Sequence, residues 1–202
     1  MMQAVPMFDD VTAVVLAGGR SSRFGSDKLA FEIDGRTMLD HAVAAVGAVT
    51  SHVILVLAPG TEMPLALASA VAGHVHDSSA FEGPLAALAA ALEVIETPVA
   101  LVVAGDMPRM VPAVLQRLAS TAGADRPAVN LEVPRRMQPL PMAISVEAAR
   151  PAVAALLERG ERSLRALLTE LGTSSIPAPV WLSLDPAGTT ILDVNRPGDL
   201  RG

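Results

Sequence analysis

Cysteine is absent from this chain of 202 residues, which excludes disulfide bonds, thiolate zinc sites and a cysteine nucleophile. Aromatic residues make up only 2% of the sequence, so the core must be built from aliphatic side chains. No apolar run approaches the roughly 18 residues that a membrane-spanning helix needs. Residues 1–10 lack the basic start of a secretory signal. These absences favour a cytoplasmic protein with no membrane partner, although a lack of cysteine is compatible with any compartment.

The balance of charge excludes a further class of partner. The net charge is −6, whereas proteins that bind DNA or RNA duplexes present a cationic face. Nucleic acid is therefore not expected as a partner. A small anionic ligand remains compatible with this charge, because a few cations gathered in one loop are enough to bind it.

Apolar strands and helices are expected to alternate along the first part of the chain. The pattern predicts strands at 11–16, 52–57, 75–77 and 99–103, with helices at 38–48, 65–72, 84–95 and 112–121. Such alternation predicts an α/β fold, Rossmann-like and doubly wound, with a mostly parallel sheet.

The later part of the chain is less regular. It predicts strands at 128–133, 140–145, 181–184 and 190–194, and helices at 146–159 and 164–171. No linker or repeat separates the two parts, so residues 1–202 are expected to form a single domain.

A loop rich in glycine, serine and cations follows the first predicted strand. It reads Leu-Ala-Gly-Gly-Arg-Ser-Ser-Arg-Phe-Gly-Ser-Asp-Lys over residues 16–28. Gly18 and Gly19 allow a sharp turn and a close approach to a ligand. Ser21 offers a hydroxyl, while Arg23 and Lys28 bring positive charge. A strand that ends in such a loop is what polyphosphate binding requires.

Lysine occurs only once in the chain, at Lys28, and the other 14 basic residues are arginine. A lysine in that background indicates a position where a compact ammonium group is wanted rather than a planar guanidinium. The alternative is that one lysine simply remains in an arginine-rich composition. The loop matches neither a Walker A motif nor a dinucleotide-binding glycine motif.

The loop does resemble the opening signature of the MobA-like nucleotidyltransferases, Leu-Ala-Gly-Gly-x-Ser-x-Arg-Phe/Met-Gly-x-Asp-Lys. The type member of that family is molybdenum cofactor guanylyltransferase. The resemblance implies a nucleotide-diphospho-sugar transferase-like topology, with a nucleotide-binding half at about 11–121 and an acceptor-binding half at about 127–202. It also implies that Leu16 and Ala17 join Gly18, Gly19, Ser21 and Lys28 in binding the nucleotide. Arg23 and Lys28 would act in catalysis.

Two aspartates are candidate magnesium ligands. Asp106 follows an apolar strand in Gly-Asp-Met-Pro, a context similar to that of the family's catalytic aspartate, and would hold Mg²⁺ beside a bound triphosphate. The alternative is a turn or helix-capping aspartate. Asp193 lies in a segment that resembles the family's closing motif, where it is either a second ligand of the metal or a turn residue.

Asp77 is the candidate for recognition of the base. Together with the following Glu-Gly-Pro-Leu at 82–85, which includes Gly83, it resembles the family's base-contacting segment. A carboxylate can accept hydrogen bonds from both N1–H and the 2-amino group of guanine; the alternative is a solvated loop acid. His74 and His76 share one face of a strand with no third ligand expected nearby, so a metal there is disfavoured.

The acceptor side is predicted from weaker similarities. Gln138 lies in Gln-Pro-Leu-Pro-Met-Ala, and Arg162 in a helix-start segment, both similar to family segments near the acceptor. Asn195 is a further candidate contact, although Arg196 replaces the threonine usual in that motif. Arg135, Arg136, Arg162 and Arg165 are candidate contacts for an anionic acceptor, and the alternative for each of them is an ordinary surface arginine.

The resemblance implies transfer of GMP from GTP to Mo-molybdopterin with Mg²⁺ as the cofactor, giving molybdopterin guanine dinucleotide and pyrophosphate. Other molybdenum cofactor biosynthesis proteins, or the apoenzyme that receives the product, would be partners. The Gly18–Gly19 pair favours GTP, because members with Leu-Ala-Ala-Gly tend to use CTP. Two alternatives stay open: a cytidylyltransferase, or a nucleotidyltransferase for another phosphorylated acceptor. A nucleotide-binding regulatory protein without turnover is the alternative from another class.

Overall fold

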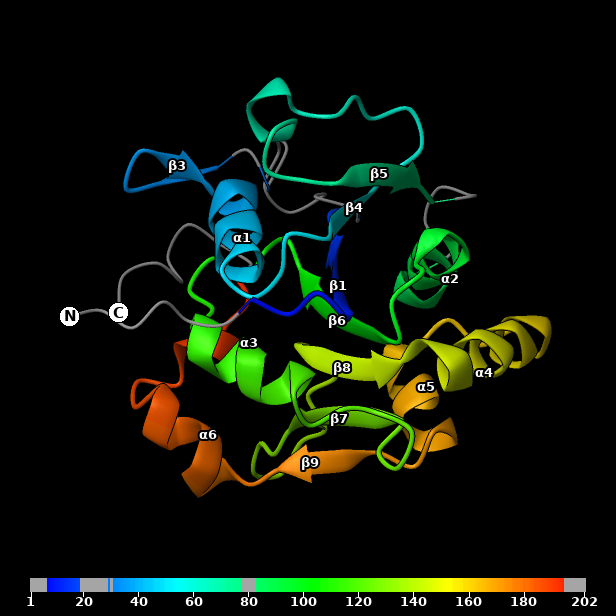
Figure 1. Ribbon diagram of the computed structural model, residues 1–202. Helices are drawn as coiled ribbons and strands as arrows, with labels where there is room; N and C mark the ends of the chain where they lie inside the picture. The colour runs from blue at the N-terminus through cyan, green and yellow to red at the C-terminus, as the bar shows by residue number, and fades with distance from the viewer. Residues whose placement is uncertain (1–6, 19–28, 30, 78–82, 195–202) are drawn as a thin grey trace.

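The computed structural model describes residues 7–18, 29, 31–77 and 83–194. A seven-stranded mixed sheet runs through it in the order β5-β4-β1-β6-β8-β7-β9 (Figure 1). The strands are β1 (Val11–Leu16), β4 (Val53–Leu57), β5 (Gly73–His76), β6 (Val99–Ala104), β7 (Ala128–Leu131), β8 (Met142–Ser145) and β9 (Ser174–Ile176). The α/β fold with a mostly parallel sheet that the sequence predicts is thereby confirmed.

Strand β1 lies at the centre of the parallel part of the sheet. All six of its residues are buried, which explains why it is apolar throughout rather than alternating with polar residues. It pairs in parallel with β4 and β6, and Val14 lies opposite both Ile54 and Val102. Strands β1, β4, β5 and β6 therefore end at the same edge of the sheet, called here the carboxyl edge.

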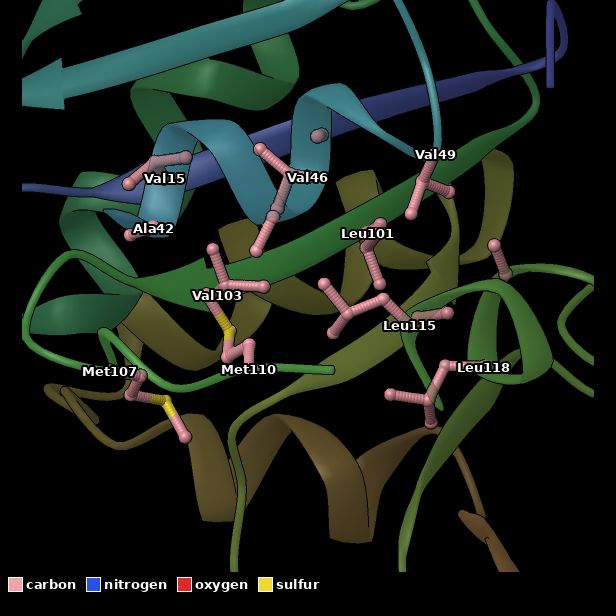
Figure 2. Packing of buried hydrophobic residues seen from close by; sticks show 14 of the residues in the cluster. Val15, Ala42, Val46, Val49, Leu101, Val103, Met107, Met110, Leu115 and Leu118 are labelled. Carbon is pink, nitrogen blue, oxygen red and sulfur yellow. The ribbon is translucent and has the colours of Figure 1, made fainter. Parts of the chain in front are cut away.

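Six helices cover the two faces of the sheet (Figure 1). On one face lie α1 (Met38–Gly47), α3 (Pro112–Ala119) and α6 (Ala178–Leu184); on the other lie α2 (Pro84–Val94), α4 (Val146–Glu158) and α5 (Leu164–Glu170). The hydrophobic cluster between the sheet and α1, α3 and α6 is called here the first core. Figure 2 shows it, with Val15, Val46, Leu101 and Leu115 meeting from β1, α1, β6 and α3. In the described ranges no helix has both the length and the apolar character that crossing a membrane would take.

A short hairpin leads into α1. Strands β2 (Glu32–Ile33) and β3 (Arg36–Thr37) pair around Asp34 and Gly35, which both have positive φ, as an Asp-Gly hairpin turn requires. Thr37 then begins the helix through a capping box with Asp40, in which each side chain accepts from the backbone N–H of the other residue. The helix start predicted at residue 38 is confirmed.

Strand β8 reverses the direction of the sheet. It pairs antiparallel with both β6 and β7, so β7 and its parallel neighbour β9 run in the same direction as β1. Their carboxyl ends, at Leu131 and Ile176, therefore lie at the carboxyl edge, and β8 begins there. Loops from both halves of the chain are thus presented along one edge of the sheet.

Several local predictions are wrong. Residues 181–184 form the end of helix α6 rather than a strand, because the exposed Leu182 and Leu184 imitate strand alternation while Trp181 alone is buried. The helix expected at 65–72 is reduced to the 3₁₀ turn η2 (Leu65–Leu67), and the strand expected at 190–194 begins as the 3₁₀ turn η3 (Thr189–Ile191). Strand β9 was not predicted, because its sequence Ser-Ser-Ile carries little apolar pattern.

Candidate active site at the carboxyl edge

Candidate residues from the first part of the chain follow strands β1, β5 and β6 at the carboxyl edge. The Gly105 N–H donates a 3.0 Å hydrogen bond to the carbonyl oxygen of Leu16, joining the ends of β6 and β1. The Asp77 N–H donates over 2.9 Å to the carbonyl of Leu57, continuing the pairing of β5 with β4. In α/β sheets this edge is where ligands bind.

The start of the glycine-rich loop is fixed by the same sheet. Ala17 donates from its backbone N–H to the carbonyl of Val56 over 2.9 Å. A Cβ added at Gly18 would lie 3.5 Å from the backbone nitrogen of Ala58, an ordinary contact, so the protein itself leaves room for alanine there. The remaining predicted loop residues, Gly19, Ser21, Arg23 and Lys28, lie outside the described residues.

Asp106 and Asp193 are brought together from distant parts of the chain. The Val194 N–H donates a 3.0 Å hydrogen bond to the carbonyl oxygen of Asp106, so Asp193 adjoins the turn that carries Asp106. Met107, which follows Asp106, is 1% exposed and packs into the first core (Figure 2). This anchoring fixes the Asp106 turn from behind. Asn195, the next candidate after Val194, lies outside the described residues.

The segment before Asp193 is held by a buried carboxylate. Asp185 is 3% exposed and accepts from the Thr190 N–H at 2.7 Å and from the Thr189 hydroxyl at 3.3 Å. Burial alone would raise the pKa of Asp185, but the hydrogen bonds from Thr190 and Thr189 outweigh it and hold the pKa below 3.8. The Thr190 hydroxyl in turn accepts from the Val111 N–H, next to α3.

Gly83 and Arg162 join the two halves at the start of α2. Gly83 has φ 97°, and a Cβ there would lie 3.0 Å from both the Cβ and the carbonyl oxygen of Arg162. That carbonyl accepts from the Leu85 N–H at 3.4 Å. The guanidinium of Arg162 donates to the carbonyls of Leu157 and Glu161. Arg162 therefore precedes the start of α5, and its side chain stabilises its own loop.

Gln138 lies in the loop between β7 and β8, and its position depends on a residue that the sequence interpretation missed. Asn130 of β7 is 3% exposed, and its Nδ2 donates to the carbonyl oxygen of Gln138 over 3.1 Å. Its Oδ1 accepts from the Ser175 hydroxyl at 2.7 Å. The signal in the sequence that could have identified this residue is an asparagine inside the apolar segment 128–131, because a buried amide needs specific partners.

His74 and His76 lie side by side on β5. Their rings lie edge-to-face with centroids 5.4 Å apart, which confirms that they share a face, and His76 Nε2 lies 3.0 Å from the Thr61 carbonyl. Within 7–18, 29, 31–77 and 83–194, no group of three or more acidic or histidine side chains is placed to hold a metal ion. A magnesium ion held by one or two carboxylates plus phosphate oxygens does not need such a group.

A cavity of about 670 Å³ lies at the opposite edge, between the amino ends of β1, β4 and β5. Asp9, Asp10 and His52 are among its lining residues. It is separated from the candidate site by the length of the central strands, and it is lined by none of the predicted site residues that the structure describes.

The fold and this edge define an α/β protein of the class that binds ligands where its parallel strands end. Two solved structures share the fold. Molybdopterin-guanine dinucleotide biosynthesis protein A from Archaeoglobus fulgidus has a TM-score of 0.74 at 22% identity, covering 94% of this chain and 95% of that one. 2-C-methyl-D-erythritol 4-phosphate cytidylyltransferase from Thermus thermophilus has a TM-score of 0.69 at 18% identity, covering 93% and 94%.

Sequence comparison identifies the family. The model of the MobA-like NTP transferase domain matches residues 13–175. A probable molybdenum cofactor guanylyltransferase from Chloroflexus aggregans is 31% identical over 98% of this chain and 95% of its own. The molybdenum cofactor guanylyltransferase of Pseudomonas aeruginosa PAO1 is 34% identical over 81% and 82%. The chain belongs to the MobA-like NTP transferase family and is a nucleotidyltransferase.

Proposed function

We propose that this enzyme transfers GMP from GTP to Mo-molybdopterin in the cytoplasm, giving molybdopterin guanine dinucleotide and pyrophosphate. The observation that carries the proposal is near-full-length similarity to relatives named molybdenum cofactor guanylyltransferase. The carboxyl edge supports it, because Asp77 and Asp106 follow strands that end there, and the residue after Asp193 is hydrogen-bonded to Asp106.

Magnesium suits the donor set at Asp106. Carboxylate oxygens are the ligands that Mg²⁺ prefers, and the hydrogen bond between Val194 and Asp106 places a second aspartate, Asp193, beside the first. Magnesium bound there would neutralise charge on the triphosphate and polarise the α-phosphoryl group. We assign Asp106 as the principal ligand and Asp193 as the second.

The chain's own residues then position the reactants. The backbone from Leu16 through Gly19, with Ser21, cradles the triphosphate. Lys28 and Arg23 offset the charge that develops on it. An oxygen of the acceptor's terminal phosphate forms a bond to the α-phosphorus in line, while the bond from the α-phosphorus to the bridging oxygen breaks and pyrophosphate leaves. No covalent intermediate with the protein is required, so catalysis is positioning plus electrostatics.

We assign Asp77 to the guanine base and Gln138 with Asn195 to the acceptor. Asp77 adjoins the end of β5 and lies on the same edge as Gly83, which opens α2. Arg162 binds the carbonyls of Leu157 and Glu161 through Nη1, so Nε and Nη2 would be its donors to an acceptor. The proteins that deliver Mo-molybdopterin or receive its nucleotide form would be the partners in the cell.

The first experiment is thermal stability with GTP, CTP, ATP and UTP, each with and without Mg²⁺. A ligand that binds only the folded state stabilises it by about 2.7 kcal/mol at about 100 times its Kd. We expect stabilisation by Mg-GTP alone, followed by pyrophosphate release that requires Mo-molybdopterin. A preference for CTP would support a cytidylyltransferase. Nucleotide binding without turnover on Mo-molybdopterin would contradict the proposed reaction.

A matched variant tests the choice of base. Gly18→Ala creates the Leu-Ala-Ala-Gly form of the loop, and the structure accommodates its methyl group at 3.5 Å from Ala58. We expect the variant to fold normally and to lose preference for GTP, because the methyl group crowds a purine. Full retention of GTP preference would remove the glycine pair from the explanation of specificity.

A further inference from the structure

We propose that Asn130 is a positioning residue for the acceptor, acting through the loop that joins β7 to β8. This inference rests on the proposed function, in which that loop contributes Gln138 to the acceptor site. Asn130 itself is buried in the sheet and touches the acceptor only through the loop.

The orientation of the Asn130 amide follows from its partners. The carbonyl oxygen of Gln138 can only accept, so the group that faces it at 3.1 Å must be Nδ2. Oδ1 then faces the Ser175 hydroxyl, which donates to it over 2.7 Å. The amide thus connects three segments: β7, the unpredicted edge strand β9, and the far end of the loop.

The near end of the loop is held by α6. The Glu132 carbonyl accepts from Nε1 of Trp181 at 2.9 Å, and the Glu132 carboxylate accepts from the Ala178 N–H at 2.8 Å. Glu132 is also paired with β9, since its N–H donates to the Ile176 carbonyl. Both ends of the loop are therefore fixed to the β9–α6 unit.

Between these two anchors the loop presents positive charge. Arg135 and Arg136 are exposed, and Arg135 has φ 66°, a left-handed conformation that few side chains other than glycine adopt readily. The Arg136 N–H closes the turn by donating to the Val133 carbonyl at 3.4 Å. Both ends of this loop are fixed, and its exposed turn carries two arginines beside Gln138. Such a turn suits an acceptor that carries a phosphate.

A buried amide at position 130 fixes the position of the β7–β8 loop, which an apolar residue there would not do. A valine or leucine at 130 would fill the strand, but it would leave the Gln138 carbonyl without this donor. The loop could then shift relative to the sheet. Misplacement of a substrate contact by about 1 Å can cost on the order of a hundredfold in rate. The amide therefore contributes to acceptor affinity beyond its contribution to folding.

Asn130→Asp is the decisive variant, because the carboxylate matches the amide in size but cannot donate to the Gln138 carbonyl when ionised. We expect the KM for Mo-molybdopterin to rise at least about tenfold, with the KM for GTP unchanged within about twofold. Ser175→Ala, which removes only the hydrogen bond that orients the amide, should change the acceptor KM in the same direction and less. It serves as the second variant if the aspartate impairs folding.

Thr12→Val is the matched control. Thr12 is 4% exposed and its hydroxyl bonds that of Thr97 at 2.7 Å, but it lies at the amino end of β1. It should lower the melting temperature without changing either KM. The inference is overturned if Asn130→Asp and Ser175→Ala both retain the wild-type KM for Mo-molybdopterin, or if the KM values for GTP and acceptor rise together. Failure of the wild-type enzyme to use Mo-molybdopterin would instead overturn the proposed function.

Discussion

The backbone N–H of Val194 lies 3.0 Å from the carbonyl oxygen of Asp106 and donates a hydrogen bond to it. This contact closes the candidate site, because it brings the last described residues of the chain to the turn after β6. It involves only main-chain atoms, so side-chain substitutions at Asp106 or Asp193 can test metal binding without breaking the link between the two segments.

Asp106→Asn should abolish magnesium-dependent turnover. The amide is a weaker ligand for Mg²⁺ than a carboxylate, and we expect kcat to fall by at least about a hundredfold. Pyrophosphate release with GTP and Mo-molybdopterin measures the loss. Asp125→Asn is the matched control, since Asp125 is exposed in the loop between α3 and β7 at the opposite edge. Unchanged pyrophosphate release by Asp106→Asn would remove Asp106 from the mechanism.

Asp193→Asn should have a smaller and different effect. As the second ligand, Asp193 would contribute to the affinity for magnesium more than to the reaction itself. We expect the Mg²⁺ concentration for half-maximal activity to rise about tenfold, with most of kcat recovered at saturating metal. A magnesium titration of turnover checks this. An identical magnesium dependence in wild type and variant would assign Asp193 to the turn alone.

Asp77→Asn should weaken recognition of guanine. The carboxylate can accept from N1–H and from the 2-amino group, and loss of a charged hydrogen bond is worth about 1.5–3 kcal/mol, or roughly tenfold to a hundredfold in GTP affinity. Inosine triphosphate, which lacks the 2-amino group, provides the control. The wild-type protein should prefer GTP over ITP, and this difference should shrink in the variant. An equal GTP-to-ITP ratio in both proteins would contradict the assignment.

Gly83→Ala should destabilise the protein by about 1–3 kcal/mol, since φ 97° with ψ 168° is a conformation that only glycine adopts without strain. The new Cβ would also press on the Arg162 backbone, 3.0 Å away. Denaturant unfolding measures the loss. Gly47→Ala is the control, because Gly47 ends α1 with open space around it. That substitution should stabilise by up to about 1 kcal/mol. Equal stability of the two variants would contradict the strain argument.

Asp185→Asn should reveal an acid-dependent contribution to stability. The folded state holds the pKa of Asp185 below 3.8, so its contribution is fully present above that value and is lost as pH falls through the lower folded pKa. We expect the variant to be less stable by about 1–3 kcal/mol at neutral pH, and the difference from wild type to shrink below pH 3.8. Denaturant unfolding from pH 7 to pH 3 measures it. A difference independent of pH would contradict the role of the charge.

The sequence predicted the parallel part of the fold because local pattern was sufficient there. Strand β1 is buried along its whole length, and the run of apolar residues at 11–16 predicts this burial. Asp106 was predicted for the same reason, since it follows the apolar strand β6. Asp77 follows β5, whose residues alternate in exposure, and was predicted from its resemblance to the family's base-contacting segment. Their common edge then follows from the rule that parallel strands end together.

The rest depended on contacts between residues far apart in sequence. Strand β9 consists of two serines and an isoleucine, and it forms because Asn130 and the β7 backbone offer partners. Helix α6 exposes Leu182 and Leu184, so its apolar residues do not mark a buried face. The sequence around Val194 and the sequence around Asp106 give no indication of the hydrogen bond between these two residues.

Trp181 gives the protein an optical property as well as a packing one. It is the single tryptophan of a chain that contains no tyrosine, so ultraviolet fluorescence comes essentially from this one indole. The ring is 2% exposed, and its N–H is bonded to the Glu132 carbonyl where the β7–β8 loop begins. Emission from the unlabelled protein therefore reports on the surroundings of one buried indole, at the place where α6 holds the start of the β7–β8 loop.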